Sequence, residues 1–221
     1  LFVRTLVLKN DTGKMLLVQT EKNIVTDTLP DGSMITLNKN SSVEYNSKFT
    51  KDVKRSVKLK GEAFFTVTPD KKKPFVIAVN DIEVKVVGTS FNIKTINGQT
   101  EVIVKTGIVE VIRNNKTITL TPEQKVITQR NDTALTKQTD PDKLFNYYQS
   151  KEFVCDATPL WRLAEVLNEA YDVNIVIARK ELRGLQINTT FSNESLDKIL
   201  KVVAVTLQLE VIKKDNDIIL Q

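Results

Sequence analysis

The chain has 221 residues, a formal net charge of +5, one cysteine and no histidine. The lack of histidine excludes Ser-His-Asp and Cys-His relays, an imidazole general base and a His-ligated zinc, and the single Cys155 excludes thiolate clusters and internal disulfides. No run approaches the roughly 18 consecutive apolar residues of a membrane-spanning helix, and the N-terminal sequence lacks the features of a secretory signal. We therefore expect a chain without a membrane span, large enough for two domains. Its start at Leu1 suggests a fragment of a longer protein.

The charge is unevenly distributed along the chain. Residues 1–140 hold 22 Lys and Arg against 15 Asp and Glu, whereas residues 141–221 hold 10 against 12. This shift predicts a boundary near Asp140-Pro141, with domains over residues 1–140 and 151–221 and a linker over residues 141–150. The basic residues of the first part alternate with apolar ones, which indicates a solvated sheet face, and no basic patch with interleaved aromatics indicates nucleic acid.

Residues 1 to about 130 alternate apolar and polar side chains with the period of two that is typical of β-strands. Between Val57 and Val67, for example, the odd positions share one face. Turn signals separate such runs at short intervals: Asn10-Asp11-Thr12-Gly13, Pro30-Asp31-Gly32, Pro69-Asp70, Asn97-Gly98 and Asn114-Asn115. We therefore predict an all-β domain of short antiparallel strands in layered sheets, which form either a sandwich-like arrangement or a short coil of sheet.

The polar stretch from Thr28 to Tyr45, TLPDGSMITLNKNSSVEY, could be a ligand-binding loop or a turn between strands. Proline presets φ, aspartate can cap its own backbone and glycine tolerates positive φ, so Leu29-Pro30-Asp31-Gly32 is predicted to reverse the chain. The spacing of the acidic residues Asp27, Asp31 and Glu44 does not match a calcium loop.

Other candidate chemical groups also favour structural roles. Gly88-Thr89-Ser90-Phe91-Asn92 departs from the Gly-x-Ser-x-Gly nucleophile elbow at its last position, and no histidine can activate Ser90. Cys155 is expected to be a small buried apolar residue. Arg55 and Glu62 are expected to brace a strand face or turn through ion pairs. We predict no enzyme activity, no catalytic residue, no cofactor and no metal site.

Beyond Pro141 the apolar period becomes helical. Thr158-Pro159 is predicted to cap a helix whose apolar positions are Leu160, Leu163, Ala164, Leu167 and Tyr171, followed by a strand from Val173 to Ile177. The pattern repeats 36 positions later at Leu196, Ile199, Leu200, Val203 and Leu207. Strands Phe153–Cys155 and Leu185–Phe191 precede the two helices, and a hairpin across Lys214-Asp215-Asn216 adds a strand from Asp217 to Leu220. These patterns predict two tandem βαβ units, with two helices packed on one small sheet through core leucines. The predicted fold class is mainly β plus α+β.

Several motifs in fixed order carry a family resemblance. TLPDGSMITLNKNSSVEY, RSVKLKGEAFFTV, PFVIAV, VVGTSFNI, KTGIVEV and LTPEQK resemble the periplasmic part of the FecR family of transmembrane anti-sigma regulators. The segments FVCDATPLWRLAEVLNEAYDVNIVI and TFSNESLDKILKVVA resemble the next domain of FecR-like proteins of Bacteroidetes, which is similar to the secretin and TonB short N-terminal domain. This chain has Phe145-Asn146-Tyr147-Tyr148 where many relatives have a Trp-containing linker.

The resemblance implies a signalling function. Such a chain would be the periplasmic sensor part of a transmembrane anti-sigma factor, which relays a signal from the signalling domain of a TonB-dependent outer-membrane transporter to an extracytoplasmic-function sigma factor. The resemblance also implies that the parent protein spans the inner membrane once and holds the sigma factor through a cytoplasmic segment absent from this chain. The transported ligand, iron-siderophore or glycan, stays open.

An alternative is a carbohydrate-binding or adhesive extracytoplasmic β-domain protein. It would be favoured if Trp161, Tyr147, Tyr148 and Tyr171 formed an exposed aromatic platform.

For the signalling function we expect the partner to dock on the C-terminal domain, along an open sheet edge. The candidate strands are residues 207–212 and 217–220, one of which should lie at an edge. The candidate partner-binding residues are Leu207, Leu209, Val211, Ile218, Ile219 and Leu220. A proline at Ile219 is expected to remove a backbone donor from this edge.

Overall fold

A computed structural model describes residues 6–10, 13–129, 134–139, 142–214 and 217–221. The chain divides into two compact units, residues 1–141 and 142–221. Parts of three predicted features, the turn at Asn10-Asp11-Thr12-Gly13, the boundary at Asp140-Pro141 and the turn at Lys214-Asp215-Asn216, lie outside the described residues. The predicted fold class, mainly β plus α+β, is confirmed.

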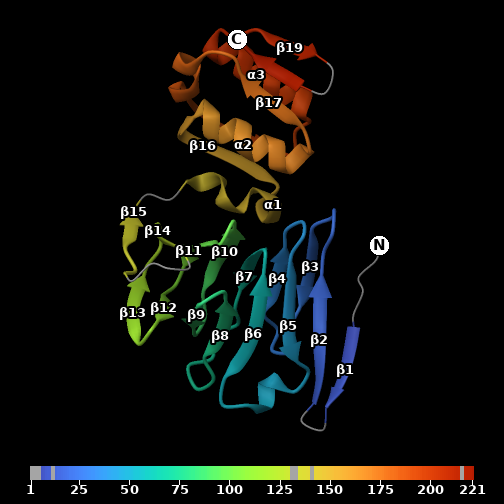
Figure 1. Ribbon diagram of the computed structural model, residues 1–221, viewed down its shortest axis with the longest axis vertical. Helices are drawn as coiled ribbons and strands as arrows, with labels where there is room; N and C mark the ends of the chain where they lie inside the picture. Colours follow the sequence, from blue (N-terminus) through green and yellow to red (C-terminus); the bar gives the residue numbers. More distant parts are fainter. Residues whose placement is uncertain (1–5, 11–12, 130–133, 140–141, 215–216) are drawn as a thin grey trace. The chain divides into compact units, whose positions relative to one another are not determined.

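The first unit is a β-sandwich of two sheets (Figure 1). The first sheet contains, in spatial order, β1 (Leu6–Asn10), β2 (Gly13–Gln19), β5 (Ser42–Asn46), β6 (Arg55–Lys60), β8 (Phe75–Val79), β9 (Ile82–Val86), β12 (Val109–Arg113) and β13 (Lys116–Leu120). The second sheet contains β15 (Lys137–Thr139), β14 (Gln124–Gln129), β11 (Gln99–Thr106), β10 (Ser90–Ile96), β7 (Glu62–Thr66), β4 (Met34–Leu37) and β3 (Val25–Thr28). Neighbouring strands are antiparallel except β6 and β8, which are parallel. A short 3-10 helix, η1 (Phe49–Lys51), precedes β6.

The core between the sheets follows the predicted alternation. In β6, Val57 and Leu59 are buried while Ser56, Lys58 and Lys60 are exposed. Phe65 stacks on Phe91 with ring centroids 5.2 Å apart and meets Phe75 of the other sheet edge-on at 6.2 Å. Rings at these distances gain favourable quadrupole contacts beyond their burial, so these three rings link the two sheets.

The run from Val57 to Val67 is two strands rather than one, because the chain passes from the first sheet to the second at Gly61. Gly61 has φ +84, and a Cβ there would lie 2.5 Å from Ser41 Oγ and 2.9 Å from Asn40 O. Only glycine fits this corner without strain. The odd positions point inward on both sides of the corner, as predicted.

The segment Leu29-Pro30-Asp31-Gly32 is the predicted turn. Gly32 N–H donates to Leu29 O at 2.9 Å, and Ser33 N–H donates to Asp31 Oδ1 at 3.0 Å. The sequence did not indicate a second contact of Asp31: its Oδ2 accepts a 2.7 Å hydrogen bond from Arg55 of β6. The turn between β3 and β4 of the second sheet is thus tied to a strand of the first.

Arg55 is 3% exposed and joins several backbone segments. Its Nε donates to Lys73 O at 2.8 Å and its Nη1 to Thr68 O at 2.9 Å, and the guanidinium carbon lies 5.4 Å from the centre of the Phe75 ring. Arg113 of β12 makes a similar connection: it donates to Asp81, to Thr128 Oγ1 of the second sheet and to Gln129 O. These two arginines fasten the sheets to each other.

Glu62 lies at the start of β7 and its carboxylate is buried with hydrogen-bonding partners. Oε1 accepts from Asn92 Nδ2 at 3.0 Å and Oε2 from Asn38 Nδ2 at 2.9 Å, while Lys94 Nζ lies 3.3 Å from Oε2. The expected bracing roles of Arg55 and Glu62 match these contacts, because each buried charge is hydrogen-bonded to neighbouring strands and turns.

The second unit holds two helices at the predicted offset of 36 positions, α2 (Leu160–Tyr171) and α3 (Leu196–Leu207). The single small sheet predicted for them is wrong. Strands β16 (Glu152–Pro159) and β18 (Gln186–Ser192) form an antiparallel pair, and β17 (Asn174–Ile177), β20 (Asp217–Leu220) and β19 (Val211–Lys214) form a separate sheet. A period-two pattern marks strands but leaves their pairing partners open, so sequence could not separate the two sheets. Among the helices of the described residues, none has the length and apolar character needed to cross a bilayer.

Three further short helices belong to the second unit: η2 (Lys143–Asn146), α1 (Tyr147–Ser150) and η3 (Lys180–Gly184). Residues 142–150, predicted as part of a linker, therefore fold as structure of this unit, with Leu144, Tyr147 and Tyr148 buried. The predicted cap at Thr158 is also wrong. Thr158 is the second-last residue of β16, and its Oγ1 accepts a hydrogen bond from Asp156 N–H at 3.1 Å. Pro159 occupies the N-cap position of α2.

Removing Arg55 should destabilise the sandwich strongly, because Asp31 would remain buried without its cation. We expect Arg55→Met to lower the free energy of unfolding by about 3–5 kcal/mol. The matched control is Lys85→Met, which removes the half-exposed Lys85–Glu110 pair at 2.9 Å and should cost less than about 1 kcal/mol. Denaturant unfolding monitored by circular dichroism measures both changes, and equal losses would contradict the prediction.

The second unit should depend on the buried leucines of α2 and α3. Leu163 is 0% exposed, so Leu163→Ala should destabilise this unit by about 2–5 kcal/mol through lost burial and the cavity left behind. Val205 of α3 is 75% exposed, and Val205→Ala serves as a control with little expected change. Unfolding curves that shift equally for both variants would show that Leu163 is not a core residue.

Candidate partner-binding surface

Metal-ligating side chains, Ser90 and Cys155 are the groups considered as carriers of chemistry. Among the described residues, no cluster of three or more metal-ligating side chains occurs. Ser90 opens β10, and its N–H donates to Thr106 Oγ1 at 3.2 Å. Burial raises the pKa of the Cys155 thiol to about 11; a hydrogen bond with Thr158 lowers it and the charge of Asp142 raises it by smaller amounts. Cys155 is buried, as predicted, and at neutral pH it is a protonated, weak nucleophile.

The aromatic platform of the carbohydrate-binding alternative does not form. Tyr147 and Tyr148 are 7% and 4% exposed. Tyr147 stacks on Phe153 with centroids 5.5 Å apart, and Phe153 stacks on Tyr171 at 6.0 Å. Burial, and then the charge of Glu194, raise the pKa of Tyr171, whose hydroxyl donates to Glu194 O at 2.7 Å. Three of the four rings thus serve the interior of the unit, and Trp161 alone of the four is exposed.

Among the residues that the structure describes, β19 pairs only with β20 and so forms an open edge of the sheet of β17, β20 and β19, as expected for one of the two candidate strands. Glu210 and Gln221 exchange both backbone hydrogen bonds, at 2.8 and 3.1 Å. Since bonded and non-bonded pairs alternate in an antiparallel ladder, Ile212 also bonds to Ile219, whereas Val211 and Lys213 do not bond to their partners on β20. The backbone N–H and C=O groups of Val211 and Lys213 therefore point to the open edge.

The six predicted site residues do not lie on one strand: two lie at or after the end of α3, one lies on the edge strand β19 and three lie on the central strand β20. Leu207 is the last residue of α3 and Leu209 follows it, with its N–H donating to Ala204 O at 2.9 Å. Val211 lies on the open edge. Ile218, Ile219 and Leu220 belong to β20, which is the central strand, so the expectation that a proline at Ile219 would act at an edge is wrong.

The side chains of Ile218 and Leu220 also face inward and are 8% and 1% exposed. They cannot contact a partner from the interior of the unit. The register of the strand pairing decides which side chains face the interior and which backbone groups point to the open edge. The sequence alone does not reveal that register.

Sequence reasoning named Ile219 but missed two residues, Val176 and Ile212, that share its face of the sheet. Val176, Ile219 and Ile212 are cross-strand neighbours in one row, on the face opposite the buried Ile218 and Leu220. Val176 is 39% exposed, and Ile212 and Ile219 are half-buried. The short segments NIVI, VIKK and DIIL contained these three residues, but only the register of the strands places them side by side. A strand added to β19 would extend the row beyond Ile212.

Basic and acidic side chains frame the same edge. Lys213 Nζ lies 2.7 Å from Asp197 Oδ1 in the first turn of α3, and both side chains are exposed. Lys214 is exposed at the end of β19. The edge is thus a short strand with open backbone groups, a partly apolar face and flanking charges, which suits the addition of a strand from another protein.

These features define a class: a β-sandwich followed by an α+β unit whose small sheet ends at an edge strand, β19. A family model described as FecR protein matches residues 17–110, and a model described as FecR, C-terminal matches residues 152–220. The two matches together cover more than half of the chain, which therefore belongs to the FecR family. No curated protein matches the chain.

Solved structures agree with this assignment. Two crystal structures of a proposed anti-sigma factor from Parabacteroides distasonis ATCC 8503, at 1.65 and 2.50 Å resolution, resemble this chain with TM-scores of 0.71 and 0.70. Both are 26% identical in sequence, and each comparison covers 93% of this chain and 98% of the other. The similarity spans both units.

The burial of Cys155 leads to a test with thiol reagents. Because its folded pKa of about 11 exceeds the ordinary value of 9.0, the thiol should react slowly with iodoacetamide at neutral pH and rapidly after unfolding in urea. The protonated thiol contributes stability that is complete below pH 9 and is lost as the pH rises toward 11. Mass spectrometry measures the modification, and equal rates in folded and unfolded protein would show an accessible thiol.

Proposed function

We propose that this chain is the periplasmic sensor part of a transmembrane anti-sigma factor. The observation that carries the proposal is that both units match the FecR models in order, while a proposed anti-sigma factor resembles the chain over 98% of its own length. In this role the chain receives a signal from a TonB-dependent outer-membrane transporter and passes it to an extracytoplasmic-function sigma factor. Such a relay needs a binding surface rather than a reaction centre.

The relay also requires parts of the protein outside this chain. A membrane-spanning segment would anchor the chain at the inner membrane, with the described units in the periplasm. A cytoplasmic segment would hold the sigma factor. The Bacteroidetes type of FecR protein is the form to which we assign it.

The transporter's signalling domain docks, in this proposal, by adding a strand to β19. The N–H and C=O groups of Val211 and Lys213 would pair with the incoming strand, which satisfies both edges without a deep pocket. An apolar side chain of the partner opposite Ile212 would extend the row of Val176, Ile219 and Ile212 and fix the register. Lys213 and Lys214 would favour an acidic flank on the partner strand.

Proline at the edge tests this docking mode. Lys213→Pro removes an outward N–H and leaves the ladder to β20 intact, so the unit should stay folded while binding to the signalling domain weakens about tenfold or more. Lys213→Ala is the matched control, because it loses the ion pair to Asp197 but keeps the backbone donor. It should bind almost normally. Biolayer interferometry against a panel of purified transporter signalling domains measures the affinities.

The outcomes separate the docking mode from the function. Normal binding by a folded Lys213→Pro variant would exclude the β19 edge but leave the relay in place. Two results together would overturn the proposed function. No signalling domain would bind the unmodified chain, and the expression of a sigma-dependent reporter would not change when this chain is deleted from the parent protein.

A further inference from the structure

One end of the β-sandwich exposes apolar side chains to water. The strand registers place the start of β6, the start of β8, the end of β9 and the start of β12 at this end. Helix η1 and the start of β6 mark it at the lower end of the sandwich in Figure 1. Three loops each present one apolar side chain there: Val53 is 86% exposed, Ile108 is 56% exposed and Val87 is 38% exposed. We call residues 47–54, 69–74, 87–89 and 107–108 the basal loops.

Hydrogen bonds hold neighbouring basal loops together. Lys73 Nζ donates to Thr50 O, Asp70 N–H donates to Val87 O at 2.8 Å, and Thr89 Oγ1 donates to Ile108 O at 3.0 Å. Val87 and Ile108 also lie directly beyond the last residue pair of β9 and β12, so they are neighbours. The three exposed apolar side chains therefore belong to one continuous surface.

Lysines surround the most exposed of these side chains, Val53. Residues 47–54 and 69–74 hold six lysines against Asp52 and Asp70, a net charge of 6 − 2 = +4. Five of the lysines have exposed side chains: Lys48, Lys51, Lys54, Lys71 and Lys72. The Asp70 carboxylate faces its own loop, because its Oδ1 accepts from the N–H groups of Lys72 and Lys73 at 2.9 and 3.2 Å.

Other charged groups near this end leave the surplus positive. Asp31 and Glu110 are each paired with a cation. Asp27 lies in β3, at the edge of the second sheet, and Glu123 follows β13, the last strand of the first. Lys14 is exposed and adjoins residues 47–54, since its N–H donates to Ser47 Oγ at 3.2 Å. Counting Lys14, Asp27 and Glu123 gives +4 + 1 − 2 = +3.

Apolar side chains on projecting loops, with lysines around them, suit a lipid surface better than a protein surface. A protein partner would need a separate hollow for each of the three loops, whereas lipids rearrange around whatever projects. Anionic head groups attract the lysine ammonium groups, and the lysine stems can follow an apolar side chain into the interface while the charge stays among the head groups. The occupant is thus chosen by charge and by the shape of the end together.

We propose that the basal loops bind the surface of an anionic lipid bilayer, with Val53 inserted among the head groups. Val87 and Ile108 would lie at the same interface, and the exposed lysines would contact lipid phosphates. One inserted side chain and a few lysines give weak, reversible binding. The inference goes beyond the proposed relay, because it concerns lipid rather than protein and uses no residue of β19.

Co-sedimentation with vesicles tests the proposal. The purified chain should bind vesicles made of equal parts of phosphatidylglycerol and phosphatidylcholine and should not bind phosphatidylcholine alone. Raising the salt concentration from about 0.05 M to about 0.5 M should release the chain, because the shorter Debye length screens the lysines. A chain that stays in the supernatant with anionic vesicles at low salt would overturn the proposal.

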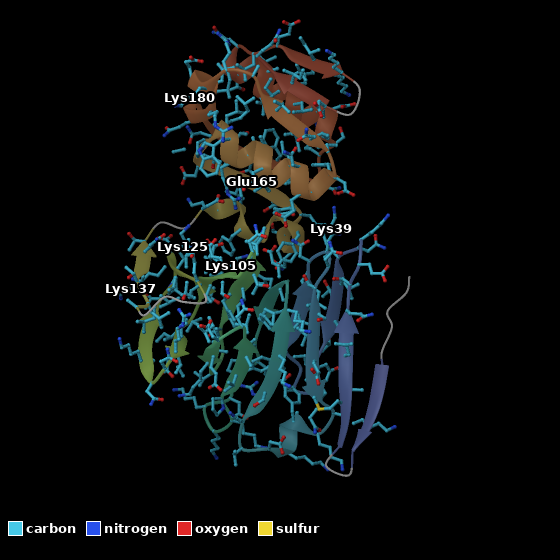
Figure 2. All side chains as sticks on the ribbon, in the orientation of Figure 1. Lys39, Lys105, Lys125, Lys137, Glu165 and Lys180 are labelled. Carbon is cyan, nitrogen blue, oxygen red and sulfur yellow. The ribbon has the colours of Figure 1, made fainter. Side chains whose placement is uncertain are left out.

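Charge reversal tests the position of the contact. Lys71→Glu with Lys72→Glu should weaken vesicle binding about tenfold or more, because two attractive charges become repulsive. The matched control is Lys22→Glu with Lys60→Glu, which makes the same change of charge at exposed positions of the opposite end of the sandwich, where Figure 2 labels Lys39. The control should change binding by less than about twofold. Equal losses would show that only the net charge matters and would contradict the proposal.

Serine at the loop tip tests insertion. Val53→Ser should weaken binding to anionic vesicles about fivefold, because an apolar side chain no longer leaves water. Ile96→Ser is the control, since Ile96 is 53% exposed at the far end of β10 and should not touch lipid. If charge reversal abolishes binding while Val53→Ser binds normally, no apolar side chain is inserted and the proposal is wrong.

A fluorescent label locates the interface directly. The environment-sensitive dye NBD can be attached at neutral pH to Val53→Cys or to Ile96→Cys, because the native Cys155 is buried and protonated. Anionic vesicles should move the emission of the dye at position 53 to shorter wavelength and leave the dye at position 96 unchanged. Equal shifts at both positions, or binding of the loops to polyglutamate but not to vesicles, would overturn the proposal. Circular dichroism of each variant verifies the fold.

Discussion

The buried ion pair of Arg55 and Asp31 is the constraint on which the sandwich depends. Its 2.7 Å contact joins a strand of one sheet to a turn of the other, and the same guanidinium holds the carbonyl groups of Thr68 and Lys73. A buried charge tolerates almost no displacement, because losing a partner exposes the full desolvation penalty. The pair therefore fixes the relative position of the sheets more sharply than apolar packing, which accepts small shifts.

The strands and turns of the sandwich could be predicted from sequence, but the contacts between strands that are distant in sequence could not. Alternation identified the strands and their inward faces, and Pro30-Asp31-Gly32 identified a turn that Asp31 caps on its own backbone. That Asp31 also receives Arg55 from 24 positions away depends on which strands meet, and no local pattern encodes that. For the same reason, the shared face of the odd positions from Val57 to Val67 did not show that Gly61 turns the chain into the second sheet.

The second unit shows the same division between local and non-local information. Helical spacing located α2 and α3 and their repeat, because the side chains of one helix face are set by residues three and four apart. The candidate surface was predicted only in part. β19 does lie at an edge, yet Ile218 and Leu220 turned out to be interior residues, since a strand in the middle of a sheet and a strand at its edge can have the same alternation.

The central place of β20 makes the second unit dependent on the very end of the described chain. Strand β20 pairs with β17, and Asn174 meets Asp217 across 43 positions of sequence. Neither β17 nor β19 has another partner in this sheet among the described residues. Because β17 and β19 both pair with β20, this sheet cannot assemble until residues 217–220 have joined it, so it forms in one step rather than strand by strand. A chain cut before residue 217 would keep the strands of the sandwich but would leave β17 and β19 without the strand that aligns them.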